Sequence, residues 1–220
     1  MIDIHTHILY GVDDGSENFE TSKLLIEEEI KNNVDIVILT PHQNQESKNK
    51  DELINRFESF KKEFSDYNIS FYLGSEIYYY SNMIDDLKNG KLLTINNSKY
   101  VLVEFSTEIE TDITNIVYDL KINGYIPIIA HIERYPYLDL KSYDEIKKNG
   151  GLIQINSKSF ERKIYNKKLK YLLKKDLVDF ISSDCHNAKR NCDFEYAKKY
   201  IAKKFKNKYE KFFNNKFIFE

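Results

Sequence analysis

The order of apolar residues constrains the fold of this chain most strongly, because short apolar runs alternate with longer segments of helical pattern. Seven runs are predicted to be strands, and they cover residues 2–5, 36–40, 70–73, 100–105, 126–130, 152–155 and 178–182. The helical pattern occurs at residues 20–32, 50–64, 112–123, 143–149, 166–174 and 194–204. Strands that alternate with helices form parallel βαβ units, so the sequence predicts an α/β fold.

Seven parallel strands fit two architectures. They form either an open doubly wound sheet or a barrel slightly smaller than the eight-stranded type. In both architectures the functional residues lie at the C-terminal ends of the strands. Polar residues at those ends are therefore the first candidates for a site.

Length and charge narrow the function classes. At 220 residues and 26.2 kDa we expect one domain over residues 1–220. The net charge of −2 gives no general attraction to nucleic acid. No apolar run approaches the roughly 20 residues that span a bilayer, and the first residues do not resemble a secretory signal, so we expect a cytoplasmic protein. Two cysteines, Cys185 and Cys192, are too few for a disulfide framework.

Polar residues follow every predicted strand, and all five histidines of the chain are among them. The candidates are His5, His7, Asp13, Asp14, His42, Glu76, Glu104, His131, Glu133, Arg134, Asn156, Ser157, Asp184 and His186. Taken alone, such a histidine is usually a hydrogen-bonded structural residue, and such a carboxylate is usually a helix cap or loop residue. Their joint occurrence at one end of all the strands favours a metal centre.

The spacing of these residues indicates how they converge. Residues i and i+2 of a strand point to the same side, so His5 converges with His7, and Asp184 with His186. Imidazole and carboxylate donors without thiolates are typical of a functional Mn, Fe or Zn site rather than of a structural, cysteine-rich zinc site. One zinc ion does not need all four candidate carboxylates, which are Asp14, Glu76, Glu104 and Asp184. We therefore predict two or three ions, with a carboxylate such as Glu76 between them.

Such a centre favours phosphoester chemistry. Metal ions lower the pKa of a bound water from about 16 towards 7 and neutralise phosphoryl oxygens. Arg134 and Arg190 stand close enough to His131 and His186 in the sequence to bind further phosphate oxygens. The alternative for both arginines is an ordinary surface ion pair.

The candidate residues at the strand ends lie in seven short stretches, which are MIDIHTHILYGVDDGS, TPH ending at His42, GSEIYY, YVLVEFS, PIIAHIERY, QINS and ISSDCHN. These stretches resemble the polymerase-and-histidinol-phosphatase (PHP) superfamily. Within it, the chain is similar to the bacterial manganese-dependent protein-tyrosine phosphatases of capsule and exopolysaccharide operons. AHIERY together with EIYY and SSDCHN is the most specific part, because many metallohydrolases share the initial HxH.

The resemblance implies a distorted TIM-like (β/α)7 barrel of the PHP type with a trinuclear site. The implied metal ligands are His5, His7, Asp14, His42, Glu76, Glu104, His131, Asp184 and His186. The implied catalytic residues are Arg134, Arg190 and His42, with Arg134 on the phosphate. Mn²⁺ is the expected metal, with Fe, Zn, Co or Mg as alternatives. The expected substrate is phosphotyrosine on the tail of a cognate bacterial tyrosine kinase that regulates polysaccharide export.

Other functions fit parts of the same pattern. A small-molecule phosphatase acting on a compound like histidinol phosphate would use the same metals, and a non-enzymatic metal or phospho-ligand regulator is a different class. A cysteine-dependent phosphatase needs Cys-x5-Arg, but counting from Cys185 reaches Asn191 and counting from Cys192 reaches Lys198. For phosphotyrosine, Tyr78, Tyr79 and Tyr80 either form part of a ring-accepting rim or simply pack.

The C-terminal segment, about residues 194–220, is predicted to be a basic helix. Its apolar residues at helical spacing are Ile201, Phe205, Tyr209 and Phe212. Such a helix could make weak peripheral contact with an anionic membrane. We favour the simpler expectation that it packs on the rest of the domain and exposes its lysines.

Overall fold

The computed structural model describes residues 1–47 and 49–214. Its strands are β1 (Ile2–Thr6), β2 (Ile36–Leu39), β3 (His42–Gln43), β4 (Ser70–Leu73), β5 (Glu76–Tyr78), β6 (Tyr100–Glu104), β7 (Ile126–Ile129), β8 (Leu152–Asn156) and β9 (Phe180–Ser182). Each of the seven predicted runs contains a strand. The sequence did not predict β3 and β5, because two or three residues are too short for a recognisable pattern.

Helices occupy the connections between these strands. They are α1 (Phe19–Lys31), α2 (Lys50–Glu63), α3 (Met83–Lys88), α4 (Ile113–Ile122), α5 (Leu140–Lys148), α6 (Asn166–Lys174), α7 (Glu195–Lys204) and α8 (Tyr209–Phe213). All six predicted helices are present, α3 was not predicted, and α8 lies within the longer helix predicted over about residues 194–220. Helix α5 begins three residues earlier than predicted, because the Asp139 side chain caps it by accepting a hydrogen bond from the Ser142 amide.

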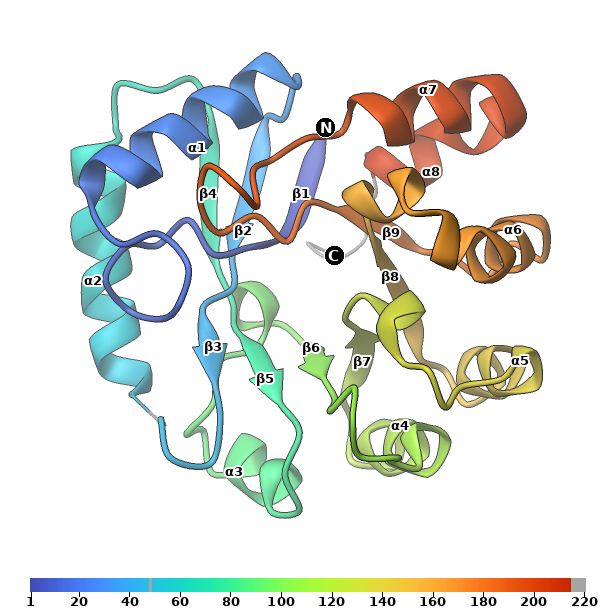
Figure 1. The fold of residues 1–220 in the computed structure, drawn as a ribbon. Helices are drawn as coiled ribbons and strands as arrows, with labels where there is room; N and C mark the ends of the chain where they lie inside the picture. The colour runs from blue at the N-terminus through green and yellow to red at the C-terminus, as the bar shows by residue number, and fades with distance from the viewer. Residues whose placement is uncertain (48, 215–220) are drawn as a thin grey trace.

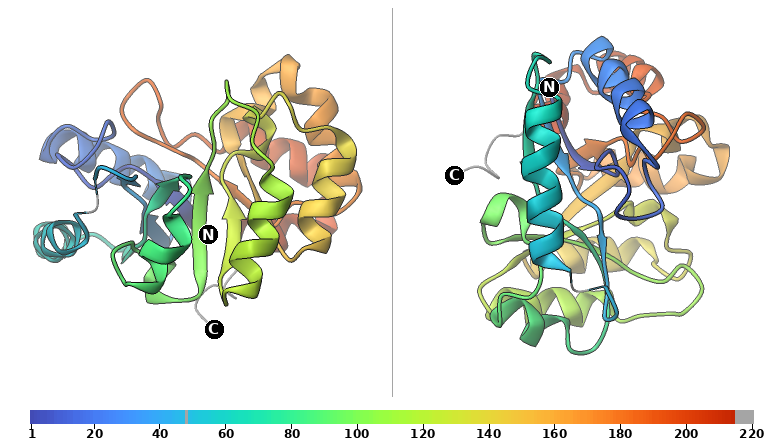
Figure 2. Two further views of the ribbon diagram at one scale, coloured as in Figure 1. Left: turned by 90° about the horizontal axis from the view of Figure 1, so that it is seen from below. Right: turned by 90° about the vertical axis from the view of Figure 1, so that its left-hand side faces the viewer.

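All strand pairs are parallel, which gives an α/β fold built on parallel sheets. One sheet has the order β1-β2-β4 and the other the order β3-β5-β6-β7-β8-β9. At the far edges β1 lies beside β9, since the His5 carbonyl accepts from the Asp184 amide at 2.9 Å. Figure 1 shows the strands around the middle of the molecule and the helices outside them, and Figure 2 gives two further views.

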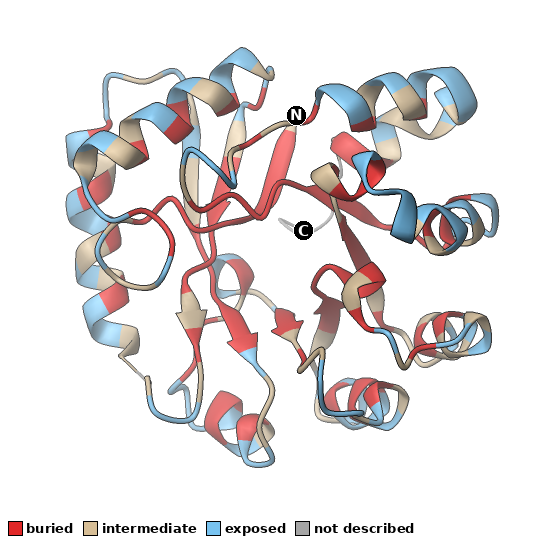
Figure 3. Ribbon diagram, in the orientation of Figure 1, coloured by how far each residue is buried: buried red, intermediate tan, exposed pale blue. Residues whose placement is uncertain are grey.

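The alternation of strand residues divides the core into two layers. In β6, Leu102 belongs to an inner cluster, whereas Val101 and Val103 pack in a larger cluster that includes helix residues. Most strands are consequently largely buried, with β4 more exposed, whereas the helices bury one side only (Figure 3). This packing leaves the C-terminal strand ends as the place where polar side chains gather.

Strand β1 is irregular where it approaches the site. Residues 3 to 6 of β1 pair with residues 37 to 39 of β2, so β1 has one extra residue there. Ile4 lies in the inner cluster, and the next residue, His5, also turns towards the inside. A regular strand would place these neighbours on opposite sides, and a bulge removes that restriction.

The C-terminal segment differs from the single helix predicted over about residues 194–220. Helix α7 ends at Lys204, Phe205 is non-helical with φ −142° and ψ 40°, and a short 3-10 turn, η5 (Lys206–Lys208), leads into α8. Ile201 and Phe212 are buried, so this apolar face packs on the domain as favoured above. Residues 215–220 of the predicted helix lie outside the described residues. No described helix has the length and apolar character needed to cross a membrane.

Candidate metal centre

The strand ends bring together all nine side chains that the family resemblance implies as ligands. Each belongs to at least one group whose nitrogen or oxygen atoms lie within 4.8 Å of one another. These groups are His7, Asp14, His42 and His186; His5, His7 and Asp184; His5, Glu76 and His131; and His42, Glu76 and Glu104. The groups share members, so the donors form one connected cluster rather than separate sites.

Glu76 lies at the centre of this cluster and is 1% exposed. Its Oε2 is 3.2 Å from Nε2 of His5, 3.2 Å from Nε2 of His7 and 3.3 Å from Nδ1 of His42. Its Oε1 is 3.0 Å from Nε2 of His131. Burial alone would raise the pKa of Glu76, but His5 and the other histidines hold that pKa well below its usual range. A buried ionised carboxylate among four imidazoles is suited to bridge metal ions.

The other carboxylates extend the cluster in two directions. Asp184 Oδ1 lies 3.6 Å from Nε2 of both His5 and His7, on the buried side. Asp14 lies 3.4 Å from His42 and has a side chain that is 67% exposed, so it marks the open side.

Glu104 completes the set at the end of β6. Its Oε1 is 3.4 Å from Nε2 of His131, and burial, followed by the charge of Glu76, raises the pKa of Glu104 to about 8. The neighbouring carboxyl groups of Glu104 and Glu76 repel each other when both are ionised. The bound cations that such a cluster suits would relieve this repulsion.

Asp13, a strand-end candidate outside the implied ligand set, orients His7, and this role was not predicted. Its Oδ2 accepts hydrogen bonds from His7 Nδ1 at 2.8 Å and from the His42 amide at 3.0 Å. Gly15 completes this loop, because a Cβ there would lie 2.4 Å from the His7 carbonyl oxygen and 2.9 Å from Asp13 Oδ1. Carboxylates that hold the second nitrogen of a ligand histidine fix its tautomer and ring direction.

Gln154 performs a similar role from β8 and was also missed. Its Oε1 accepts from the His131 amide at 2.6 Å and lies 3.3 Å from His5 Nδ1. Its Nε2 donates to Asn156 Oδ1, and Asn156 in turn donates to Asp184 Oδ2 at 2.7 Å. Gln154 and Asn156 are two residues apart on one strand, which is the same spacing that identified His5 and His7.

Two of the candidate ligands have strained backbones. His131 has φ 29° and Asp184 has φ 53°, values that non-glycine residues rarely adopt. The Asp184 carbonyl accepts from His186 Nδ1 at 3.0 Å, and burial lowers the pKa of His186 to about 3. Backbone strain of this kind concentrates at functional sites.

The donors fit metal ions. His5 and His7 each direct Nδ1 at an acceptor, so their Nε2 atoms, 3.2 Å apart, both face the centre. Burial would lower the pKa of His5, but the Glu76 and Asp184 carboxylates raise it overall. The converging nitrogens and carboxylates are therefore suited to positive charge between them, which metal ions would supply.

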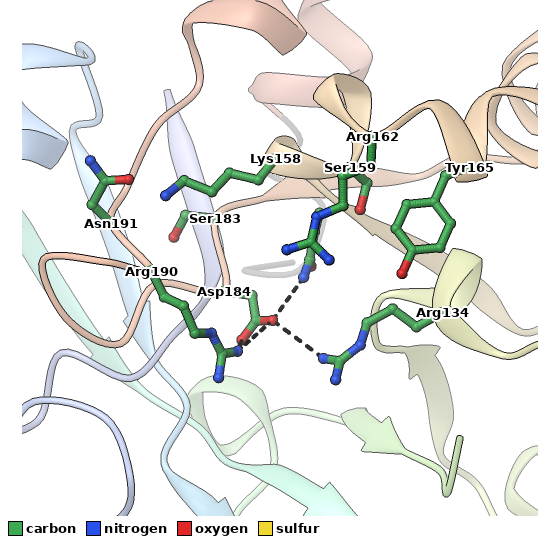
Figure 4. A pocket seen from close by; sticks show the side chains of 10 residues that line it. Arg134, Lys158, Ser159, Arg162, Tyr165, Ser183, Asp184, Arg190 and Asn191 are labelled. Atoms are coloured by element: carbon green, nitrogen blue, oxygen red, sulfur yellow. Dashed lines mark hydrogen bonds and ion pairs between the residues drawn. The ribbon is translucent and has the colours of Figure 1, made fainter. Parts of the chain in front are cut away.

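Both predicted phosphate-binding arginines lie at Asp184. Arg190 Nη2 is 3.0 Å from each Asp184 carboxylate oxygen, and Arg134 Nη1 is 3.7 Å from Oδ2. They line a cavity of about 270 Å³ next to the centre (Figure 4). Neither guanidinium is buried, so both can also contact a ligand in this cavity.

Comparison with known proteins places this chain in a family. The family model described as capsular polysaccharide synthesis, CpsB/CapC, matches residues 1–217. The chain belongs to the CpsB/CapC family. It is 36% identical to tyrosine-protein phosphatase CpsB of Streptococcus agalactiae serotype V over 204 residues, 85% of this chain and 83% of that protein. It is 33% identical to tyrosine-protein phosphatase YwqE of Bacillus subtilis, over 93% of this chain and 85% of that protein.

Solved structures agree with the CpsB/CapC assignment. A crystal structure from work on B. subtilis YwqE and Streptococcus pneumoniae CpsB, described as unique metal-dependent tyrosine phosphatases, matches with a TM-score of 0.86. It is 30% identical and covers 93% of this chain and 87% of that one. Histidinol phosphate phosphatase of Lactococcus lactis matches with a TM-score of 0.62, 16% identity and 92% of both chains. That second similarity concerns the fold alone.

The three consecutive tyrosines after Glu76 in this CpsB/CapC chain have different surroundings. The Tyr79 ring packs against Phe105 with centroids 5.3 Å apart, and the Tyr80 hydroxyl donates to Asp86 at 2.8 Å. Tyr78 is 40% exposed and lies two residues beyond Glu76 in β5. Of the three tyrosines weighed as a ring-accepting rim, Tyr78 is therefore the most accessible candidate.

The two neighbours of Arg134 in the chain, Glu133 and Tyr135, fix the backbone on either side of it, and this role was not predicted. Glu133 is buried, and its Oε1 accepts from the Asn156 amide at 3.0 Å and from Ser159 Oγ at 2.5 Å. The Tyr135 hydroxyl donates to the Ala130 carbonyl at 3.0 Å and accepts from the Phe105 amide at 3.1 Å. Their position beside Arg134 in IERY was the signal available in the sequence.

Proposed function

We propose that this chain is a metal-dependent protein-tyrosine phosphatase that hydrolyses phosphotyrosine in the control of capsular or exopolysaccharide synthesis. The observation that carries the proposal is the Glu76 carboxylate among four imidazoles, next to a cavity with two arginines. The relatives named tyrosine-protein phosphatase support the substrate class.

The nine clustered side chains would hold two or three ions, with Glu76 between them. Mn²⁺ is the metal we favour, because mixed imidazole and carboxylate donors suit it, and Fe, Zn, Co and Mg are the alternatives. Bound ions would lower the pKa of water and neutralise phosphoryl charge. The chain itself contributes oriented donors, since Asp13 and Gln154 set the directions of His7 and His5.

Arg134 and Arg190 would bind the phosphoryl oxygens that face the cavity. Each already contacts Asp184, so a phosphate there meets guanidinium groups held in place by a neighbouring carboxylate. His42 is the most exposed of the five imidazoles at 28% and stands at the mouth of the centre. We assign it a catalytic role in contacting the phosphate as well as a ligand role.

We also infer a closed, distorted TIM-like (β/α)7 barrel of the PHP type, in a single domain of residues 1–220. Its support is the pair of hydrogen bonds that His5 and His7 form with the segment after β9, and the continuation of β2 into β3 and of β4 into β5. A closed ring of strands would direct every strand end to one mouth. The cytoplasm remains our predicted location.

The predicted partner is a phosphorylated bacterial tyrosine kinase, with phosphotyrosine on its tail as substrate. A small-molecule phosphatase remains the alternative, since histidinol phosphate needs the same metals. The exposed Tyr78 favours phosphotyrosine, because its ring can pack on a substrate ring beside the centre. Weak membrane contact is less favoured, because Ile201 and Phe212 are buried.

One assay separates the two phosphatases. The purified chain is given Mn²⁺ and either a phosphotyrosine peptide or histidinol phosphate, and kcat/KM is measured for each. We expect the peptide to be preferred by about ten-fold or more, equivalent to about 1.4 kcal/mol in the transition state. A preference for histidinol phosphate would overturn the substrate proposal. Equal hydrolysis of the peptide without any metal would overturn the mechanism.

A further inference from the structure

The cavity beside the metal centre has a second wall that the phosphatase reaction does not explain. Residues 157–165 follow β8 and form two 3-10 turns, η3 (Ser157–Glu161) and η4 (Lys163–Tyr165). Lys158, Arg162 and Tyr165 of this segment line the cavity opposite the loop that carries Arg190. Figure 4 shows the side chains of Arg134, Arg162 and Arg190 directed into the same space around Asp184.

The cations of the cavity differ in their partners. Arg134 and Arg190 form ion pairs with Asp184, whereas Lys158 donates to the Lys189 carbonyl at 3.3 Å. Within residues 1–47 and 49–214, no carboxylate lies within ion-pair distance of Arg162. The cavity therefore has positive charge that its own acidic residue does not neutralise.

This second wall is fixed relative to the phosphate-binding side. Ser159 Oγ donates to Glu133 Oε1 at 2.5 Å, and Glu133 directly precedes Arg134. The Asn156 amide donates to the same oxygen at 3.0 Å. A group bound by Arg162 would thus lie at a set place relative to a phosphate bound by Arg134.

The segment also exposes one large apolar side chain. Ile164, between Arg162 and Tyr165, is 81% exposed, which is unusual for an isoleucine. A cation, an aromatic ring and an exposed aliphatic side chain side by side suit an extended peptide better than a small metabolite, which would fill only the inner cavity.

We propose that residues 157–165 recognise an acidic side chain adjacent to the phosphotyrosine of a protein substrate. Arg162 and Lys158 bind its carboxylate or a second phosphate, and Tyr165 and Ile164 contact the neighbouring peptide. The proposal rests on the proposed phosphatase function, and it adds a sequence preference to that function. Arginine suits both anions, because its planar group binds two oxygens at once.

The test compares phosphotyrosine peptides of one length that differ only in the flanking residue. The flanking residue is glutamate, glutamine or a second phosphotyrosine, and kcat/KM is measured with Mn²⁺. We expect kcat/KM for the glutamate peptide to exceed that for the glutamine peptide about five-fold, because a partly exposed contact between two charges has an effect of this size. The peptide with two phosphotyrosines should be preferred more strongly if a phosphate fits the site better than a carboxylate.

Arg162→Gln should reduce the glutamate-to-glutamine ratio towards one. Because kcat/KM for both peptides is measured with the same variant, any general change in the metal centre affects both values and leaves their ratio unchanged. Lys163→Gln is the matched control, because Lys163 is an exposed neighbour that does not line the cavity and its removal takes away the same charge. It should leave the ratio unchanged.

Two results would overturn the recognition site: equal rates for the three peptides with the native chain, or an unchanged ratio in Arg162→Gln. An equal fall in Lys163→Gln would also overturn it, since the effect would then be one of overall charge. If the native chain hydrolyses neither the peptides nor p-nitrophenyl phosphate with Mn²⁺, the proposed function itself fails.

Discussion

Two buried glutamates, Glu76 and Glu29, lie in opposite electrostatic environments close to the same loop. Both are at most 1% exposed. Glu76 is surrounded by imidazoles, and its pKa is held well below the usual range. Glu29, on α1, has Cys185 Sγ 3.9 Å from its Oε1, and burial, followed by the charge of Asp3, raises its pKa well above the usual range.

This contrast shows that partners rather than depth decide what a buried carboxyl can do. Asp184 and His186 turn to the metal centre, while Cys185 between them turns to Glu29. On that second side the Cys192 thiol contacts Cys185 Sγ at 2.8 Å and the Leu25 carbonyl at 3.5 Å. We call Glu29, Cys185 and Cys192 the rear cluster. Burial favours the neutral form of Glu29 there, whereas the histidines favour the ionised form of Glu76.

Glu76→Gln should have the largest effect. The amide keeps the shape but removes the charge that bridges the imidazoles, so activity should fall by more than about a hundred-fold and bound metal should decrease. Phosphatase activity and metal content by mass spectrometry check this. The exposed Glu108→Gln is the control, and full activity in Glu76→Gln would remove Glu76 from the centre.

Asp13→Asn should have the next largest effect. It weakens the hydrogen bond from His7 Nδ1, which costs about ten- to a hundred-fold in metal affinity or activity at comparable sites. A titration with Mn²⁺ should show a higher metal concentration for half-maximal activity. An unchanged titration would mean that the bond does not orient His7.

Glu29→Gln should change the pH dependence of stability rather than activity. Since the folded pKa of Glu29 is raised, its stabilising contribution is present below the unfolded pKa and is lost as pH rises through the folded pKa. Glutamine does not titrate, so the stability of the variant relative to the native chain should rise as pH increases above the usual pKa of a glutamate, by at most about 1.4 kcal/mol per pH unit. Thermal unfolding at several pH values, with the exposed Glu27→Gln as control, measures this. A constant difference would contradict a protonated Glu29.

Cys192→Ser should have the smallest effect on function. Activity and metal content should stay within about two-fold, while the free energy of unfolding falls by up to about 2 kcal/mol, because a hydroxyl replaces a buried thiol. A loss of one metal ion per chain would show instead that the rear cluster binds metal.

The sequence predicted the metal centre better than the residues that orient it. Strand ends and i, i+2 spacing are local features, so His5, His7 and the other candidate ligands could be found without tertiary information. The orienting roles of Asp13 and Gln154 were missed because they depend on tertiary contacts, such as that of Asp13 with the His42 amide. Gln154, for example, meets His5 from β8, 149 residues away.

The fold shows the same limit. Periodicity located the seven main strands, but β3 and β5 are short continuations that their parallel neighbours stabilise. The helical pattern after residue 194 was interrupted at Phe205, where packing of Phe212 and Phe213 redirects the chain. Ion pairs of Lys208 and Lys211 with Asp176 support that turn, and no local sequence pattern predicts these ion pairs.

Metal stoichiometry combined with activity tests the central account most directly. The chain is stripped of metal by chelation, dialysed and titrated with Mn²⁺, while bound ions per chain and hydrolysis of a phosphotyrosine peptide are measured together. We predict two or three bound ions and activity that rises with their occupancy. Full activity of the stripped chain, or saturation without any bound ion, would contradict a phosphatase centred on Glu76 and its four imidazoles.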